Sequence, residues 1–191
     1  MEKENKFKNK HGFTLVELLA VIVVLSIITL IAFYAVLPMV EKSKKNALKI
    51  EAEGLAKAAQ LYVANKAIES GNGTIPDGGC VISVKKLIDM NISELDSNHK
   101  GFVEINRDNA NNSYSYKVFL YNNDYVICNK NSSKYEATDV ANINDESASG
   151  PGVYVYNANI ISNVEIAKKD SNNLPIFCET GDNASNWSTT P

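Results

Sequence analysis

One carboxylate, Glu17, stands at the head of a long uncharged stretch of the sequence. From Leu18 to Val40 no residue carries a charged side chain. An ionised side chain inside an apolar membrane helix costs about 2.5–3.5 kcal/mol on insertion scales, so such a residue is a candidate for a functional role. Two interpretations of Glu17 are open. The carboxylate could lie among lipid headgroups at the start of the stretch, or a cation from another chain could neutralise it.

The cysteines are the second group with distinctive chemistry. Cys80, Cys128 and Cys178 all follow the apolar stretch and so face the same compartment, where an odd number favours one disulfide and one spare thiol. Three pairings are possible. We favour Cys128 with Cys178 or Cys80, because Cys128 ends a predicted strand. A zinc site of the three cysteines and His99 is the weaker alternative, because no two cysteines are closely spaced.

Other catalytic or cofactor chemistry is not indicated. There is no Ser-His-Asp order, phosphate-binding glycine loop or nucleotide fingerprint. Asp139, Asp145 and Glu146 lack the spacing of a calcium loop. The net charge is −3 and the only arginine is Arg107, which makes a nucleic-acid surface a disfavoured but open alternative. We therefore expect no enzyme activity, no metal and no cofactor.

The apolar stretch itself predicts a membrane-spanning helix. Its 23 residues exceed the roughly 20 that cross the hydrocarbon core of a bilayer. A secretory signal core is shorter and ends in a small-residue cleavage site, and a buried core helix is seldom apolar on every face. Four lysines precede the stretch and four follow it closely, so the positive-inside rule leaves its orientation open.

The residues around the head of this stretch resemble a known family. Residues 11–19 read His-Gly-Phe-Thr-Leu-Val-Glu-Leu-Leu after a lysine-rich leader. This closely resembles the type IV pilins and pseudopilins. The resemblance implies cleavage after Gly12 by a prepilin peptidase on the cytoplasmic side, and methylation of the new amino terminus at Phe13. It would place the leader, 1–12, in the cytoplasm and 41–191 outside.

The resemblance also favours the second interpretation of Glu17. After cleavage, the ammonium group of Phe13 lies four residues from Glu17 on the same helical face. In a filament, the Phe13 ammonium of an adjacent subunit would neutralise Glu17, and only a correctly stacked neighbour would supply it. Such an ion pair would set the register of assembly rather than add net stability.

Beyond the apolar stretch, the same helix is predicted to continue as an amphipathic half, 41–70. Apolar residues recur there at spacings of four and three and would pack under a head domain. These residues are Leu48, Ala52, Leu55, Ala59 and Tyr62. The whole helix is predicted from about Thr14 to Glu69. The resemblance implies the type IV pilin fold, an α+β architecture in which this long helix, with its membrane and assembly segment at 13–40, packs on an antiparallel sheet.

The globular head is predicted over 71–191. Pro76 to Gly79 predicts a turn, and Ser83 an N-cap for a short helix, Val84 to Met90. Three alternating segments predict an antiparallel meander with a hairpin turn at Asn122-Asn123, where asparagine would tolerate positive φ. The meander segments are 102–106, 114–121 and 124–128, and further strands are predicted at 153–156 and 163–166. We expect a long surface loop at 129–152 and a disordered tail at 183–191 with Trp187 exposed.

These features predict a structural subunit of a type IV pilus, serving adhesion, motility or DNA uptake. The alternative is a pseudopilin of a type II secretion system. The expected partners are copies of itself or other pilins, the peptidase and methyltransferase, a membrane assembly platform, and the lipid bilayer before assembly. The chain is expected first in the cell membrane with a cytoplasmic N-terminus, and then in a pilus on the cell surface.

Overall fold

The computed structural model describes residues 13–70, 75–111, 113–144 and 149–188. The chain divides into two compact units, Met1–Ser43 and Lys44–Pro191. One helix, α1 (Leu15–Ser70), contributes to both units and matches the helix expected from about Thr14 to Glu69. Pro38 lies inside α1 without ending it.

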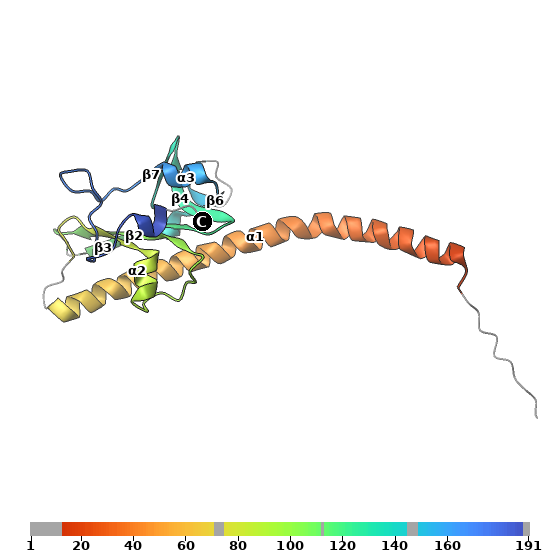
Figure 1. Ribbon diagram of the computed structural model, residues 1–191, viewed down its shortest axis with the longest axis horizontal. Coiled ribbons are helices and arrows are strands. Elements are labelled where there is room, and N and C mark those ends of the chain that lie inside the picture. Colours follow the sequence, from red (N-terminus) through yellow and green to blue (C-terminus); the bar gives the residue numbers. More distant parts are fainter. Residues whose placement is uncertain (1–12, 71–74, 112, 145–148, 189–191) are drawn as a thin grey trace, which may run out of the picture. The chain divides into compact units, whose positions relative to one another are not determined.

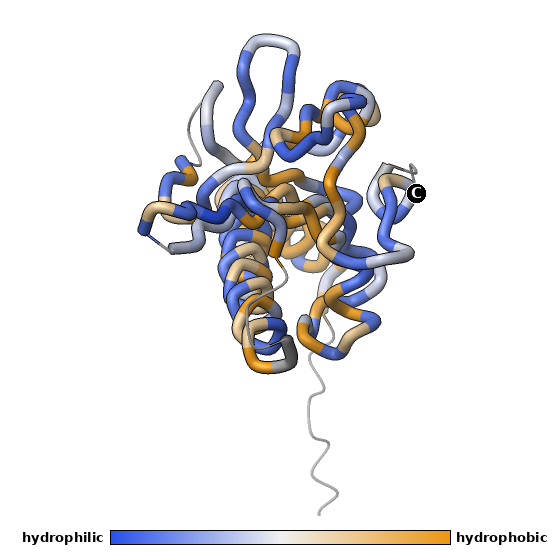
Figure 2. The backbone as a smooth tube through the Cα atoms, turned by 90° about the vertical axis from the view of Figure 1, so that its left-hand side faces the viewer, coloured by the Kyte–Doolittle hydropathy of each residue, from blue (hydrophilic) through white to orange (hydrophobic). Residues whose placement is uncertain are grey.

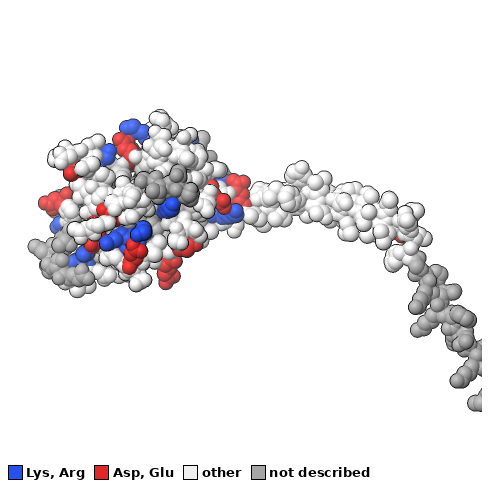
Figure 3. Space-filling model, in the orientation of Figure 1, with Lys and Arg blue, Asp and Glu red and all other residues white. Residues whose placement is uncertain are grey.

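The first unit holds the apolar half of α1. Its large side chains between Leu15 and Val40 are all about half exposed or more, as they must be in a helix that has no protein around it. By length and composition, α1 is the one helix among the described residues that could cross a membrane. Figure 3 shows this half of the helix almost free of charged side chains.

The second unit begins with the amphipathic half of α1. The five stripe residues named above are each no more than 1% exposed, which confirms the prediction that this face is buried. They join a core with the sheet residues Val103, Ile105 and Val118. Figure 1 shows this half of α1 running along the sheet.

The sheet is mostly antiparallel. Its strands are β1 (Cys80–Ser83), β2 (Lys100–Asp108), β3 (Ser113–Tyr121), β4 (Tyr125–Asn131), β5 (Lys134–Glu136), β6 (Gly150–Val155) and β7 (Val164–Glu165). Their order is β1-β2-β3-β4-β5-β7, with β6 paired to β4, and only β5 and β7 run parallel. The predicted meander is thus confirmed as β2-β3-β4. Together, helix and sheet form the predicted α+β architecture, which is consistent with the pilin fold.

The two faces of the sheet are both covered. In β2, Val103 and Ile105 face the core beneath α1, while Phe102 faces a second core on the other side. The second core is covered by the C-terminal part of the chain, including α3 (Ala158–Ser162) and α4 (Ser185–Ser188). Figure 2 shows apolar segments converging in the middle of this unit, with polar hairpins outside.

Local sequence signals explain the turns and caps. Ser83 Oγ accepts a hydrogen bond from the Lys86 amide at 3.0 Å and caps α2 (Val84–Asp89), as predicted. The amide of Gly79 donates to the Pro76 carbonyl, which confirms the turn. Gly79 has φ +100°, and a Cβ there would lie 1.9 Å from the Ile105 carbonyl oxygen, so only glycine fits.

The hairpin at Asn122-Asn123 forms for a different reason than the sequence suggested. Neither asparagine has positive φ. Instead, Asn122 Oδ1 accepts hydrogen bonds from the amides of Asp124 and Tyr125, at 3.0 and 2.9 Å. The turn is therefore held by a side chain that bonds the backbone ahead of it.

The expectation of an exposed Trp187 was wrong. Trp187 is only 3% exposed and packs against Phe102 and Phe177, with ring centroids 5.0 and 5.6 Å away. The Tyr121 hydroxyl also donates to its carbonyl. The apolar face left open by Phe102 explains why the tryptophan turns inward. Residues 183–188, expected in a disordered tail, thus include the helix α4, and 189–191 lie outside the described residues.

The segment expected as one long loop, 129–152, is largely structured. It contains the end of β4, the strand β5, the 3₁₀ turn η1 (Val140–Asn142) and the start of β6. Asn129 pairs with Glu136 on one side and Pro151 on the other. The sequence did not predict these strands, because their exposed positions are polar. Residues 145–148 lie outside the described residues.

Candidate functional site

The head of α1 is closed by a reciprocal cap between Thr14 and Glu17. The backbone amide and the hydroxyl of Thr14 both donate to Glu17 Oε2, each at 2.9 Å. In return, the Glu17 amide donates to Thr14 Oγ1 at 3.2 Å. This is a capping box, in which a threonine at the N-cap and a glutamate three residues later satisfy the first amides of the helix.

The cap gives Glu17 a role that the sequence-based interpretations omitted. The signal was present, because Thr-x-x-Glu directly before an apolar run predicts a capping box. The carboxylate therefore has hydrogen-bond partners within its own chain, at the end of the helix where the macrodipole favours negative charge.

The other residues of the cleavage motif are placed as follows. Phe13 directly precedes the cap and is 85% exposed. Gly12 and the rest of the predicted leader lie outside the described residues. The four-residue spacing of Phe13 and Glu17 is present in the sequence, and the partner of Glu17 in this structure is Thr14. Cleavage after Gly12 and methylation of Phe13 therefore stay predictions.

The apolar half that follows has few polar groups, and these are satisfied locally. The Ser26 hydroxyl donates to the Ile22 carbonyl and the Thr29 hydroxyl to the Leu25 carbonyl, each at 2.7 Å. Both side chains thus bond within the helix, as hydroxyl residues in apolar surroundings do. This half can be covered by lipid or by apolar protein surface without leaving those hydroxyls unpaired.

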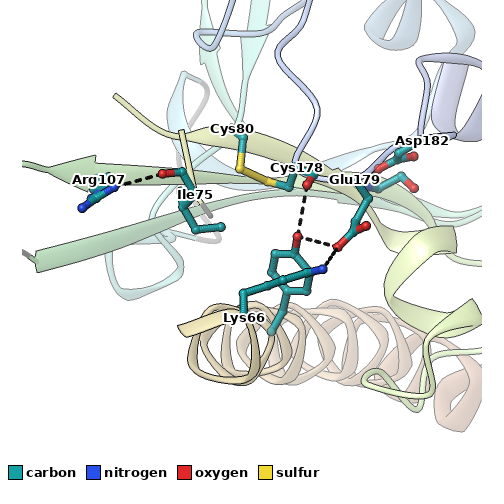
Figure 4. Close-up of a disulfide and its surroundings, with 9 residues drawn as sticks. Lys66, Ile75, Cys80, Arg107, Cys178, Glu179 and Asp182 are labelled. Carbon is teal, nitrogen blue, oxygen red and sulfur yellow. Dashed lines mark hydrogen bonds and ion pairs between the residues drawn. A yellow bond between two sulfur atoms is a disulfide. The ribbon is translucent and has the colours of Figure 1, made fainter. Parts of the chain in front are cut away.

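The disulfide joins strand β1 to the C-terminal segment, which is far from it in the sequence. Cys80, at the start of β1, is bonded to Cys178, which lies 98 positions later in the sequence. The bond lies next to α1: the Tyr62 hydroxyl donates to the Cys178 carbonyl at 3.3 Å and to Glu179 Oε1 at 2.9 Å. Lys66 Nζ lies 2.8 Å from the same carboxylate oxygen. Figure 4 shows Lys66 and Glu179 meeting beside the disulfide.

The charge of Glu179 is stabilised at this position. Burial acts to raise the pKa of Glu179, but the hydrogen bonds from Lys66 and Tyr62 outweigh it and lower the pKa below 4.5. The ion pair is largely covered, with the two side chains 23% and 17% exposed. The C-terminal segment is therefore fixed to α1 by this ion pair and to β1 by the disulfide.

The preference for Cys128 as a disulfide partner was wrong. Its side chain is completely buried in the second core, and its sulfur is free. Burial raises the pKa of the thiol to about 12, so the reactive thiolate is scarce at neutral pH. Cys128 is ordered, as expected from its strand, but the strand places its side chain away from Cys80 and Cys178.

His99 joins two parts of the head. Its Nε2 lies 2.9 Å from Glu51 Oε2 on α1, and its Nδ1 lies 2.6 Å from Asp96 Oδ1. The bond from His99 lowers the pKa of Asp96. The zinc alternative needed the thiols of Cys80 and Cys178, which are bonded to each other. Among the described residues no group of His, Cys, Asp and Glu is arranged to hold a metal ion.

A single capped carboxylate thus stands at the head of an apolar helix long enough to cross a membrane, and an α+β unit follows it in the sequence. Residues 7–33 match the family described as "Prokaryotic N-terminal methylation motif". No curated protein and no solved structure matches the chain significantly. The chain thus carries the type IV prepilin signature together with a long apolar helix. The matched motif supports a type IV pilin-like protein or a pseudopilin, and does not distinguish the two.

Proposed function

We propose that this chain is the prepilin of a structural subunit of a type IV pilus. In this proposal a prepilin peptidase cuts after Gly12, and Phe13 becomes the methylated amino terminus. The subunit then leaves the bilayer through an assembly platform and joins a filament on the cell surface through the N-terminal helix. Its role is structural, in adhesion, motility or DNA uptake.

The observation that carries the proposal is the Glu17 carboxylate at the head of the apolar helix. In the single chain, the cap with Thr14 satisfies it. In a filament without lipid headgroups or water at this depth, a carboxylate needs a cation, because an unpaired buried charge is costly. Cleavage creates such a cation at Phe13, and the methylation motif at 7–33 accompanies it.

The geometry of the cap supports the proposed assembly step. The Phe13 ammonium of an incoming neighbour would approach Glu17 from the end of the helix, where the cap already holds the carboxylate. A neighbour in the wrong register would leave one charge buried without a partner. The pair therefore acts through specificity of stacking more than through net stability.

Intact-mass measurement of filaments sheared from the cell surface tests this proposal. We expect a species that begins at N-methylated Phe13. A chain that retains Met1 and stays in the membrane fraction contradicts the proposed processing and pilus role.

Substitution of Glu17 tests the role of its charge. Glu17→Gln keeps an oxygen that can accept the bonds of the cap but removes the charge, and Glu17→Val removes both. We expect both variants to insert and to be cleaved, but to yield few filaments. Glu53→Val, which removes another exposed carboxylate of α1, is the matched control. Wild-type filament yield from Glu17→Gln would show that the charge does not set the register.

A further inference from the structure

His99 lies between two carboxylates that come from different parts of the head. Its Nε2 lies 2.9 Å from Glu51 Oε2 on α1, and its Nδ1 lies 2.6 Å from Asp96 Oδ1, three residues before it. Both distances are those of hydrogen bonds. A neutral imidazole carries one N–H and donates to only one of the two oxygens, whereas an imidazolium donates from both nitrogens. With both carboxylates ionised, the two contacts together therefore require the charged form of His99.

The two contacts are not equivalent. Asp96 belongs to the same turn as His99, and it also accepts hydrogen bonds from the amide and the side chain of Asn98, at 3.0 and 3.3 Å. The bond from His99 lowers the pKa of Asp96, so this carboxylate stays ionised and keeps the shorter contact. Glu51 lies on another element, and its contact is the longer one. When the imidazole loses a proton, Nδ1 keeps its hydrogen for Asp96, and Nε2 presents a lone pair to Glu51.

The contact with Glu51 attaches an irregular segment, 92–99, to α1. Residues 92–96 form no helix or strand, and β2 begins only at Lys100. At the beginning of the segment, the amides of Ile92 and Ser93 donate to the Leu87 carbonyl, at 3.0 and 3.2 Å. In its middle, Leu95 is only partly buried against the first core. The contact between His99 and Glu51 is thus the polar link between the end of this segment and the helix.

Open space lies on both sides of His99. One hollow, of about 630 Å³, lies between α1 and the segment 92–99. Another, of about 370 Å³, is lined by Ile88 of α2, Ser97 of the segment and Asn186 of α4. His99 lines both hollows, although its own side chain is only 11% exposed. The imidazole can therefore move away from Glu51 without displacing the core.

Charged groups from four parts of the head surround His99. The two hollows are lined by four carboxylates and three lysines. They are Glu51 and Lys57 on α1, Glu94 and Asp96 in the segment, Lys85 and Asp89 on α2, and Lys100 on β2. Lys85 and Asp89 pair with each other at 3.3 Å. Carboxylates and lysines ordinarily keep their charge between pH 5 and 8, whereas an imidazole changes its charge there. The charge balance at this place therefore changes through the imidazole.

We propose that His99 is a pH-sensitive tie, which holds the segment 92–99 on α1 when the imidazole is charged and releases it when the imidazole is neutral. On release, the Nε2 proton passes to water, and repulsion between the Nε2 lone pair and the Glu51 carboxylate separates the two side chains. Because the contact stabilises the protonated form, the tie is present in acid and is lost as the pH rises. The inference concerns contacts within one chain and does not rest on the proposed filament role. In that role the head lies outside the cell, where the pH is not held constant.

Two measurements on the full chain in detergent micelles test the tie. Nuclear magnetic resonance of the ring nitrogens follows the protonation of His99 from pH 5.5 to pH 8.5, and His99→Gln distinguishes its signals from those of His11. Amide hydrogen exchange, corrected for its intrinsic dependence on pH, follows the segment by mass spectrometry of peptides that cover 92–99. We expect both ring nitrogens to be protonated at pH 5.5 and only Nδ1 at pH 8.5. The protection of the segment should fall by about fivefold or more between these two pH values.

Glu51→Gln distinguishes a tie of this kind from a contact that only supports the fold. The glutamine side chain accepts from the imidazolium through its oxygen and donates to the neutral ring through its amide, so the segment should keep its protection within about twofold at both pH values. Glu53→Gln, at an exposed carboxylate two residues further along α1, is the matched control and should keep the wild-type dependence on pH. Trp187 fluorescence and an intact disulfide show that each head is folded.

Three results would overturn the proposal. They are equal protection of the wild-type segment at both pH values, a His99 that stays protonated on both nitrogens at pH 8.5, and unchanged pH dependence in Glu51→Gln. Filament assembly is not a readout here, so each of these results leaves the proposed function standing.

Discussion

The hydroxyl of Tyr62 lies 2.9 Å from Oε1 of Glu179, although the two residues are 117 positions apart in sequence. Tyr62 is the last residue of the buried stripe on α1, and Glu179 directly follows the disulfide cysteine Cys178. One aromatic side chain therefore does two tasks. Its ring fills the core beneath the sheet, and its hydroxyl fixes the C-terminal segment to the helix.

Removing only that hydroxyl should weaken the head measurably. In Tyr62→Phe, the ring stays in the core, but the bonds to Glu179 and to the Cys178 carbonyl are lost. Hydrogen bonds to charged groups contribute about 1.5–3 kcal/mol, so we expect a loss of about 2 kcal/mol in the free energy of unfolding. The measurement is urea unfolding of the full chain in detergent, followed by the fluorescence of Trp187.

Tyr34→Phe is the matched control, because Tyr34 is 70% exposed in the apolar half. It should leave the unfolding midpoint of the head unchanged. Equal midpoints for Tyr62→Phe and the wild type would mean that the hydroxyl contributes nothing to stability.

The Lys66–Glu179 pair should make the head sensitive to acid. The pKa of Glu179 is lowered in the folded state, so its stabilising contribution is present above the ordinary value of 4.5 and is lost as the pH falls through the folded-state pKa. The wild type should therefore lose stability below pH 4.5 more steeply than Glu179→Gln does. Unfolding midpoints measured from pH 7 to pH 3 test this, with Glu165→Gln, at the exposed Lys134 pair, as the control. Parallel curves for wild type and Glu179→Gln would contradict the assignment.

The disulfide should be the strongest single constraint on the C-terminal segment. It closes a loop of about 100 residues, for which the chain-entropy estimate is about 4–5 kcal/mol, and measured losses on removing such bonds are typically about 2–4 kcal/mol. We expect Cys178→Ser to unfold at much lower urea and to release Trp187 from its pocket. Cys128→Ala should keep the disulfide, seen as unchanged mobility on non-reducing gels. Loss of the disulfide in Cys128→Ala instead would mean that Cys128 is one of its partners.

The helix and the meander were predictable because periodic patterns specify them. The stripe from Leu48 to Tyr62 repeats at helical spacing and can be buried only on one face, and the alternation in β2 allows only one register. The Thr14–Glu17 cap was also readable from a four-residue pattern. Such local signals need no knowledge of the rest of the fold.

The features that escaped prediction depend on distant contacts. Trp187 is surrounded by polar residues in sequence. Its burial depends on contact with Phe102, 85 positions away, and with Phe177, ten positions away. The cysteine pairing depends on which face of its strand each cysteine occupies. Val81 pairs with Phe177 in an isolated bridge, which brings Cys80 and Cys178 together, while Cys128 faces the other core. No spacing in the sequence contains that information.

Glu104 should cost stability at neutral pH. Its side chain is only 2% exposed, and this burial raises its pKa above 4.5. Two contacts act to lower the pKa but do not outweigh burial. The Ala167 amide donates to Glu104 Oε1 at 2.7 Å, and Lys117 faces Glu104 across the strand pair. Because the folded state holds this proton more tightly than the unfolded state, stability falls as the pH rises above 4.5 and levels off beyond the folded-state pKa. Glu104→Gln keeps an oxygen for the Ala167 amide and has no proton to lose.

We therefore expect Glu104→Gln to be at least as stable as the wild type at pH 7, and the two to converge towards pH 4. Glu94→Gln, at an exposed residue, is the control, and Trp187 fluorescence in urea is the measurement. A variant less stable than the wild type at pH 7 would show that the ionised carboxylate is held by Lys117 more strongly than burial opposes it.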